Sequence, residues 1–130
     1  MNEPIHQEVV FQTSADRIYK ALTDGAEFKE MTGGAPTEIS SDVGGAFSCF
    51  GGMITGLNLE LVPNQRIVQA WRARNWEPGL YSIVKYELNQ QGDETCLVLD
   101  HSGFPADIRE HLEAGWTANY WELLRKHLTS

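Results

Sequence analysis

Large aromatic side chains in the second half of the chain are the residues best suited to form a binding site. Rings of this size can line an apolar pocket in which a few polar groups orient a ligand. The predicted cleft lining comprises Trp71, Trp76, Tyr81, His101, Trp116 and Tyr120. The alternative is that these rings pack as ordinary core, and the sequence leaves both interpretations open. Trp116 and Tyr120 are the strongest single candidates for the cleft.

Acid–base catalysis requires an acid and a base side by side, and Asp100 with His101 is the candidate pair. Neighbouring residues of a strand point to opposite faces, so Asp100 is not expected to orient His101 within one pocket. Further polar side chains that could reach a cleft are Glu60, Arg72, Arg74 and Tyr86. The sequence contains no GxSxG elbow, Walker loop or GxGxxG pattern. We therefore predict no catalytic residues.

Histidine and cysteine spacing predicts neither a metal site nor a disulfide. The histidines are dispersed at His6, His101, His111 and His127. His111 and Glu113 are two residues apart, which places them on different faces of a helix. Cys49 and Cys96 lack CxxC spacing, so we expect small buried hydrophobic side chains. No cofactor is expected.

Length and charge narrow the class of protein. The chain of 130 residues has the usual size of one domain, and we assign residues 1–130 to a single domain. The formal net charge of −8 opposes binding to nucleic acid or to anionic membranes, because both require a basic patch. No secretory signal or membrane-spanning run is recognisable, so a cytoplasmic location is the simplest expectation.

The elements that must position these side chains change in character along the chain. Ile5 to Phe11 predicts a strand, and Thr13 or Ser14 is expected to cap a short helix that begins at Ala15. Asp16 and Lys20 are expected to pair on the wet side of this helix, and a second short helix follows over 26–31. Short strand-like runs separated by glycine and proline turns then predict an antiparallel meander over 37–99.

One strand of this meander shows a clear alternation of apolar and polar residues. Leu57, Leu59 and Leu61 alternate with Asn58 and Glu60. Because successive side chains of a strand point to opposite faces, we expect the leucines on the dry face and the two polar residues on the wet face.

The segment after Gly103-Phe104-Pro105 predicts one long C-terminal helix. Apolar side chains recur at three- and four-residue intervals along one stripe that comprises Ile108, Leu112, Trp116, Tyr120, Leu123 or Leu124, and His127 or Leu128. Acidic residues come early in this segment and basic residues late, as the helix dipole favours. Gly115 costs about 1 kcal/mol relative to alanine inside a helix, which indicates close approach of the sheet at that point.

Ordered short motifs resemble a known family. The first group is Gly44-Gly45-x-Phe47, Gly56, Leu61-Val62-Pro63 and Ile67-Val68-x-x-Trp71-Arg72, and the second is Trp76, Pro78-Gly79, Thr95, Gly103-x-Pro105 and Gly115-Trp116. In this order, over about Ile5 to Leu128, they resemble the C-terminal domain of the activator of heat-shock protein 90 ATPase, within the START-like (SRPBCC) superfamily. The resemblance implies an α+β helix-grip fold, with two short helices after the first strand. A curved antiparallel sheet of about six to seven strands would wrap around the long C-terminal helix.

The resemblance also implies a cleft between sheet and helix, and three hypotheses follow from it. The first is a non-enzymatic domain that binds a small hydrophobic ligand, for which Trp116→Ala should weaken ligand-induced fluorescence changes without unfolding the domain. The second is an interaction module for a heat-shock protein 90 homologue, in which acidic groups dock a basic face. The third is a polyketide cyclase-like enzyme. The full co-chaperone also has a separate N-terminal domain, which is not expected in a chain of this length.

Overall fold

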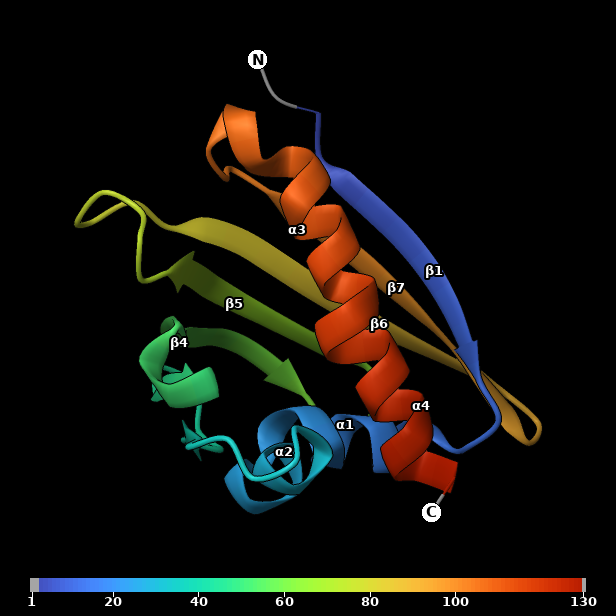
Figure 1. Cartoon of the computed structure of the whole chain (residues 1–130). Helices are drawn as coiled ribbons and strands as arrows, with labels where there is room; N and C mark the ends of the chain where they lie inside the picture. Colours follow the sequence, from blue (N-terminus) through green and yellow to red (C-terminus); the bar gives the residue numbers. More distant parts are fainter. Residues whose placement is uncertain (1–2, 130) are drawn as a thin grey trace.

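The chain folds as a curved antiparallel sheet that holds a long helical segment against one face (Figure 1). The computed structural model describes residues 3–129. The strands are β1 (Ile5–Phe11), β2 (Glu38–Ile39), β3 (Ala46–Cys49), β4 (Ile54–Val62), β5 (Arg66–Ala73), β6 (Ser82–Gln91) and β7 (Glu94–Ser102). Their order in the seven-stranded sheet is β1-β7-β6-β5-β4-β3-β2. The predicted α+β helix-grip fold is therefore confirmed.

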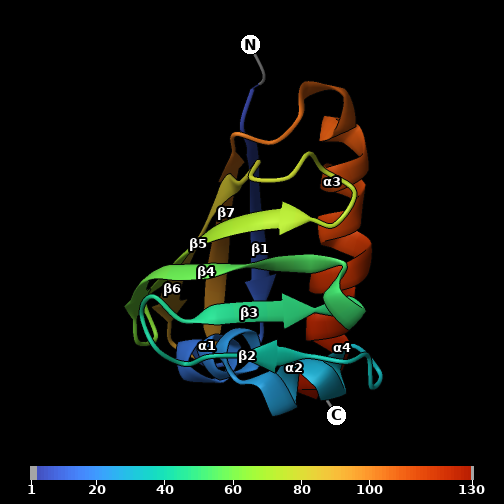
Figure 2. The same ribbon diagram turned by 90° about the vertical axis from the view of Figure 1, so that its left-hand side faces the viewer.

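The helices cover one face and one end of the sheet. They are α1 (Ala15–Thr23), α2 (Gly25–Met31), the short turns η1 (Phe50–Gly52) and η2 (Ala106–Ile108), and then α3 (Arg109–Trp116), η3 (Thr117–Trp121) and α4 (Glu122–Thr129). In Figure 1 the continuous run α3–η3–α4 crosses in front of the sheet. The helices α1 and α2 lie near the C-terminal end of this run. Figure 2 shows the same helical run standing on one side of the strands.

The start of the first helix differs in detail from the prediction. The Ser14 hydroxyl makes no capping bond to the helix but donates to the carboxylate of Asp16. The amide of Ala15 donates instead to the side-chain oxygen of Gln90, 2.8 Å away. Lys20 lies 3.7 Å from Glu27 on α2, so the expected pairing with Asp16 is wrong. A tertiary contact between α1 and the sheet thus replaces the local cap.

The second helix is capped by a side chain that immediately precedes it. The Asp24 carboxylate accepts hydrogen bonds from the amides of Ala26 and Glu27, at 2.9 and 3.1 Å. These are two of the amides that a helix start leaves without a helical partner. The cap therefore explains how α2 can begin directly after α1.

Side chains of the C-terminal helix close the free edge of β1. Arg125 donates to the carbonyl oxygen of Val10 at 2.9 Å, and Arg109 donates to the carbonyl of Pro4 at 3.2 Å. The indole N–H of Trp121 donates to the side-chain oxygen of Gln7 at 2.6 Å. An edge strand otherwise presents unpaired backbone groups to other chains. The helix is therefore fixed to the sheet by polar contacts as well as by apolar packing.

The predicted single long helix contains a wider turn at its centre. Over η3 the backbone follows π-helical geometry, and the amide of Glu122 bonds to the carbonyl of Thr117, five residues earlier. Buried side chains at Leu112, Trp116 and Tyr120 recur every four residues, which drifts by about 40° per step on an ideal α-helix. A wider turn offsets this drift. It also brings Trp121 to the buried face beside Trp116.

The orientation predicted for β4 is wrong before the bulge, whereas Glu60 is exposed and Leu61 packs against the core as predicted. Asn58 is fully buried, whereas Leu57 and Leu59 are 41% and 46% exposed. The Asn58 amide donates to the carbonyl of Ser40 at 2.7 Å and accepts from Gln69 at 3.3 Å, so the buried polar group is paired. A bulge between Asn58 and Glu60 then shifts the register. Alternation defined the two faces of this strand but not which face is buried.

The glycine that permits close approach is Gly56 rather than Gly115. A Cβ atom on Gly56 would lie 1.9 Å from the carbonyl oxygen of Ala70 and 2.6 Å from the Phe47 ring. A Cβ atom on Gly115 would meet only the Asn119 amide nitrogen, at 3.7 Å. The expectation that the sheet approaches the helix at Gly115 is therefore wrong.

Candidate functional site

A cavity of about 370 Å³ lies between the C-terminal helix and the ends of β4 and β5. Its lining residues are Phe50, Met53, Ile54, Trp71, Ala73, Asn75, Trp76, Ile108, His111, Leu112, Gly115, Trp116, Asn119 and Tyr120. The exposed members Met53, Asn75, His111 and Asn119 mark the mouth, and the buried rings form the inner wall. Ligand pockets in proteins typically hold ~300–1,000 Å³, so this cavity is at the small end of that range.

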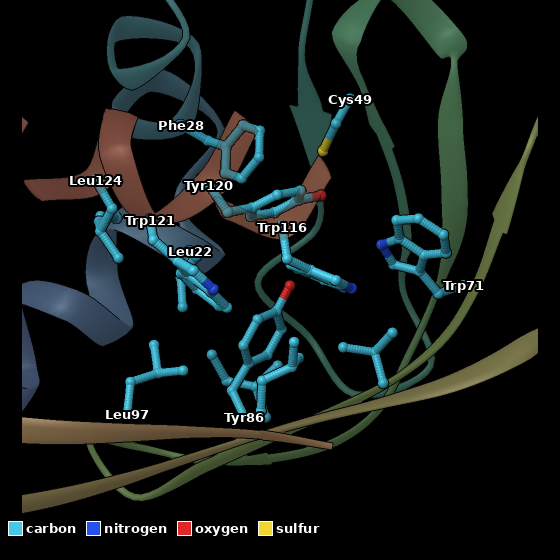
Figure 3. Close-up of a cluster of buried hydrophobic side chains, with 14 of the residues drawn as sticks. Leu22, Phe28, Cys49, Trp71, Tyr86, Leu97, Trp116, Tyr120, Trp121 and Leu124 are labelled. Atoms are coloured by element: carbon cyan, nitrogen blue, oxygen red, sulfur yellow. The ribbon is translucent and has the colours of Figure 1, made fainter. Parts of the chain in front are cut away.

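Aromatic rings form the inner wall of the cavity, and three of them, Trp71, Trp116 and Tyr120, are labelled within the buried cluster of Figure 3. The Trp116 ring lies 5.6 Å from Trp71 and 4.3 Å from Tyr120, between ring centroids. Trp71 in turn lies 5.7 Å from Trp76. Phe50 packs edge-on against Tyr120 at 5.8 Å. The spacings of 5.6 to 5.8 Å fall within the range for favourable aromatic pairs, and Trp116 and Tyr120 are in closer contact. The rings therefore support one another and hold the wall in one shape.

The structure brings together four of the aromatic residues that the sequence suggested. Trp71, Trp76, Trp116 and Tyr120 all line the cavity. Tyr81 does not, because it is 47% exposed and its ring lies under the guanidinium of Arg72, 5.9 Å away. His101 is fully buried behind the wall and is not among the lining residues. Whether the four lining rings hold a ligand stays a prediction.

Several lining residues carry no chemical signal in the sequence. His111, Gly115 and Asn119 lie on adjacent turns of one side of the helix, next to the stripe that includes Leu112 and Trp116. Their spacing of four residues is the signal that could have identified them. Phe50 could not have been found in this way, because its backbone takes a positive φ of 54° that a phenylalanine rarely adopts.

A buried chain of hydrogen bonds stands behind the cavity wall. The Trp116 indole N–H donates to Nδ1 of His101 at 3.1 Å, so the proton of the neutral imidazole is on Nε2. That Nε2–H points to the Ser82 hydroxyl 2.7 Å away, which donates to the carbonyl of Trp71 at 2.8 Å. Burial lowers the pKa of His101 to about 3. His101 therefore acts here as a neutral group that orients Trp116.

Protonation of His101 should destabilise the fold at acidic pH. Its pKa is about 3 in the folded chain against an ordinary value of 6.5, so the unfolded chain binds more protons between these values. The stabilisation is complete above pH 6.5 and is lost as the pH falls toward 3. Over the ~1.5 units from pH 6.5 to 5, the loss is about 2 kcal/mol. Urea denaturation at pH 7 and at pH 5 measures how much unfolding free energy is lost on acidification. This loss should be about 2 kcal/mol smaller in His101→Gln than in wild type. An equal loss in both proteins would contradict the assignment.

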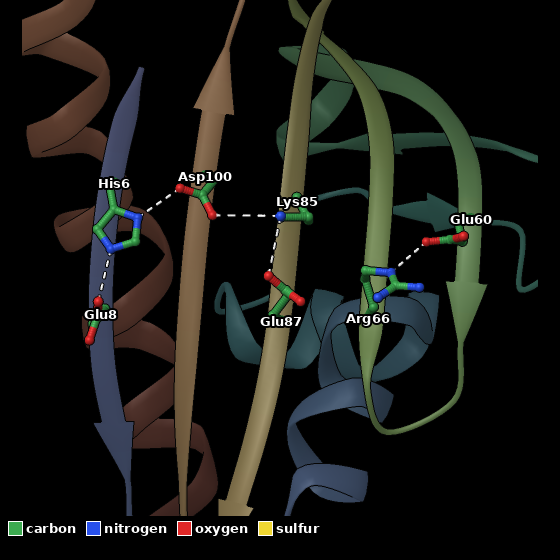
Figure 4. A network of polar contacts seen from close by, with 7 residues as sticks. All are labelled: His6, Glu8, Glu60, Arg66, Lys85, Glu87 and Asp100. Carbon is green, nitrogen blue, oxygen red and sulfur yellow. Dashed lines mark hydrogen bonds and ion pairs between the residues drawn. The ribbon is translucent and has the colours of Figure 1, made fainter. Parts of the chain in front are cut away.

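Two polar candidates, Asp100 and Glu60, lie on the outer face of the sheet (Figure 4). Asp100 contacts His6 at 2.7 Å and Lys85 at 3.9 Å, on the side of β7 opposite His101. The prediction that Asp100 cannot orient His101 is confirmed. Glu60 binds Arg66 at 2.5 Å on the same outer face. Neither Asp100 nor Glu60 lines the cavity.

The remaining polar candidates also stay out of the cavity. Arg72 donates to the carbonyls of Trp76 and Glu77, at 2.7 and 3.2 Å, and so fixes the loop that carries Trp76. Arg74 is exposed. Tyr86 is buried behind Trp116, with ring centroids 5.8 Å apart, and burial raises its pKa. None of the three lines the cavity.

Metal-binding and thiol chemistry find little support in the described part of the chain. Residues 3–129 contain no group of three or more His, Cys, Asp or Glu side chains that could hold a metal ion. Both cysteines are free thiols, and burial raises the pKa of Cys49 to about 12. Cys96 is only half-buried, in contrast to the prediction of two buried thiols. Over the same residues, no helix is long and apolar enough to cross a membrane.

Known structures share this architecture over almost their whole length. The crystal structure of PFC0360w, an HSP90 activator from Plasmodium falciparum, superimposes with a TM-score of 0.92 at 26% identity, covering 97% of this chain and 96% of that one. Protein CV1439 from Chromobacterium violaceum is also similar, with a TM-score of 0.76 at 26% identity, covering 95% and 94% of the two chains. Sheet, helix order and the gripped C-terminal helix are therefore common to these proteins.

Curated sequences give the same relationship. The Activator of 90 kDa heat shock protein ATPase homolog 1 of Homo sapiens is 29% identical over 89% of this chain, and the homolog of Dictyostelium discoideum is 32% identical over 88%. This chain spans about a third of the length of these relatives, 34% and 30% respectively. The sequence model of the family described as Activator of Hsp90 ATPase homolog 1-like protein matches residues 12–129. The chain therefore belongs to this family, within the START-like (SRPBCC) superfamily.

Proposed function

We propose that the protein binds a small apolar molecule in the cavity between the sheet and the C-terminal helix. The observation that carries this proposal is a hollow of about 370 Å³ walled by aromatic rings in an otherwise packed core. The apolar surface of this open pocket faces water in the unliganded chain, and a bound apolar molecule would remove that surface from water.

Gly115 offers a way to close the cavity without damaging the fold. It lines the cavity, and a Cβ atom there meets nothing closer than 3.7 Å. Gly115→Leu should therefore place a side chain in the cavity and also improve the helix, because glycine is a poor helix former. The adjacent exposed residue Ala114 does not line the cavity, so Ala114→Leu is a matched control on the same helix.

The test is a tryptophan-fluorescence titration of wild type and both variants with naphthalene, decanol and decanoate. At least one of these probes should saturate wild type and Ala114→Leu, and it should bind Gly115→Leu at least tenfold more weakly. Equal binding to all three proteins would place the ligand elsewhere. If none of the three probes shows saturable binding to wild type, the proposal fails.

A second candidate function is association with a heat-shock protein 90 homologue. The family membership favours it, as does the similarity to an HSP90 activator over 96% of that solved chain. Exposed carboxylates flank the cavity lining in the sequence, with Glu77 after Trp76 and Asp107 before Ile108. Together with the net charge of −8, these groups suit a basic partner surface.

Charge reversal separates this candidate from ligand binding. Glu77→Lys with Asp107→Lys should weaken association with a purified heat-shock protein 90 homologue at least tenfold at low salt. The control pair is Asp93→Lys, in the turn between β6 and β7, with Glu94→Lys at the first residue of β7. If wild type shows no association with the chaperone at low salt, this candidate function fails.

A further inference from the structure

The residue types that line the cavity restrict the charge of a ligand as well as its polarity. None of the fourteen lining residues among the described part of the chain is Asp, Glu, Lys or Arg. The polar side chains that reach the cavity mouth are the amides of Asn75 and Asn119 and the imidazole of His111. A charged ligand group enclosed there would lose its hydration without gaining an oppositely charged partner, which is costly.

The flanking charges add to this selection against anions. Exposed Glu77, Asp107 and Glu110 each adjoin a lining residue in the sequence, and Arg74 is the exposed base among their neighbours. Arg109 is engaged elsewhere, with Glu113 at 3.0 Å and the carbonyl of Pro4 at 3.2 Å. These neighbours comprise three exposed acids and one exposed base, a balance that disfavours the binding of a carboxylate.

The amides at the mouth can recognise a neutral polar group. Within residues 3–129, neither the Asn75 nor the Asn119 side chain has a hydrogen-bond partner, and both are exposed. Each carries a donor and an acceptor, so each can bind a hydroxyl or a carbonyl without a change in protonation. The two residues come from opposite walls, Asn75 from the loop after β5 and Asn119 from η3.

Size and wall chemistry favour a ring system over an alkyl chain. A volume of about 370 Å³, at the small end of the range for ligand pockets, favours a compact molecule such as two fused rings. Trp71, Trp76, Trp116 and Tyr120 present π-systems that make favourable offset or edge contacts with another ring.

We propose that the ligand of this cavity is an uncharged bicyclic aromatic molecule whose single hydrogen-bonding group lies at the mouth, against Asn75 and Asn119. This inference rests on the proposed binding function and specifies its ligand class. The rings would occupy the aromatic inner wall, and the polar group would stay partly hydrated between the two amides.

The experiment compares probes of one shape that differ in charge, by isothermal titration calorimetry at pH 8. Naphthol should bind wild type at least tenfold more tightly than naphthoate and than naphthylmethylamine, and more tightly than decanol. Tighter or equal binding of either ionic probe would overturn the proposed class. In another outcome, Gly115→Leu weakens the binding of decanol or decanoate but not the binding of naphthol. The cavity then still binds apolar molecules, and only the preference for a ring system fails.

The role of the amides is tested by the advantage of naphthol over naphthalene. One neutral hydrogen bond changes affinity by roughly two- to tenfold. Asn119→Ala should reduce the naphthol-to-naphthalene affinity ratio by this factor and leave naphthalene binding almost unchanged, with Ala114→Leu as the control. An unchanged ratio in both Asn119→Ala and Asn75→Ala would contradict the assignment of the polar group to the mouth.

Discussion

Replacement of Trp116 by alanine is expected to remove about 5 kcal/mol of folding free energy, which exceeds the cost of a typical core truncation. Loss of a buried tryptophan costs roughly 3–5 kcal/mol. The side chain is only 2% exposed and contacts the rings of Tyr86, Tyr120 and Trp121. Its removal also leaves Nδ1 of buried His101 without a donor, at roughly 1–3 kcal/mol. Urea denaturation monitored by circular dichroism measures the change.

This result would revise the expectation drawn from sequence, in which Trp116→Ala weakens ligand binding without unfolding the domain. Trp116→Phe should cost less, about 2 kcal/mol, because it keeps most of the ring packing and loses the indole N–H. Tyr81→Ala is the matched aromatic control, since Tyr81 is exposed and its main contact is with Arg72. Its loss should cost about 1 kcal/mol or less. A cost below about 2 kcal/mol for Trp116→Ala would contradict the central position of this ring.

Substitution of Gly56 by alanine should destabilise the sheet by about 3 kcal/mol or more. The new methyl group would overlap the carbonyl oxygen of Ala70, at 1.9 Å, and the ring of Phe47, at 2.6 Å. Gly56 pairs with Trp71 across β4 and β5, so the strand cannot move away without disturbing the cavity wall. Overpacking of this kind costs ~1–3 kcal/mol even where side chains can adjust.

Gly115→Ala is the control for this prediction, and its effect should have the opposite sign. The position is helical and open, so the substitution should stabilise the protein by about 0.5–1 kcal/mol. Thermal and urea unfolding of the two variants provide the comparison. Similar destabilisation by both substitutions would mean that Gly115 is packed against the sheet after all.

The residue types and their spacing predicted the first strand and the C-terminal helical segment, but not the π-helical turn within that segment. The strand Ile5–Phe11 was predicted with its observed bounds, and the amphipathic stripe predicted the C-terminal helical segment. These predictions depend on local periodicity, which the side-chain geometry of helices and strands imposes directly. The family motifs added the helix-grip topology, which periodicity alone could not supply.

The cavity wall was only partly predictable. Large rings at Trp71 and Trp116 are expected to be buried in almost any fold of this chain, and both line the cavity. Tyr81 was equally aromatic but lies outside, because β6 begins at the next residue and directs Ser82 inward. The lining residues Phe50 and Asn119 depend on a left-handed backbone turn and on a π-helical segment, neither of which follows from residue type.

What the sequence determined by itself is the set of elements, the net charge of −8 and the aromatic and apolar residues available for a core. The tertiary structure alone decided which face of each element is buried. Asn58 is inside and Leu57 outside because Gln69 and the carbonyl of Ser40 satisfy the buried amide. Gly56 has no room for a Cβ atom and Gly115 is open because only Gly56 has another strand across it. Both outcomes depend on contacts between residues distant in the chain, and local propensity contains no information about such contacts.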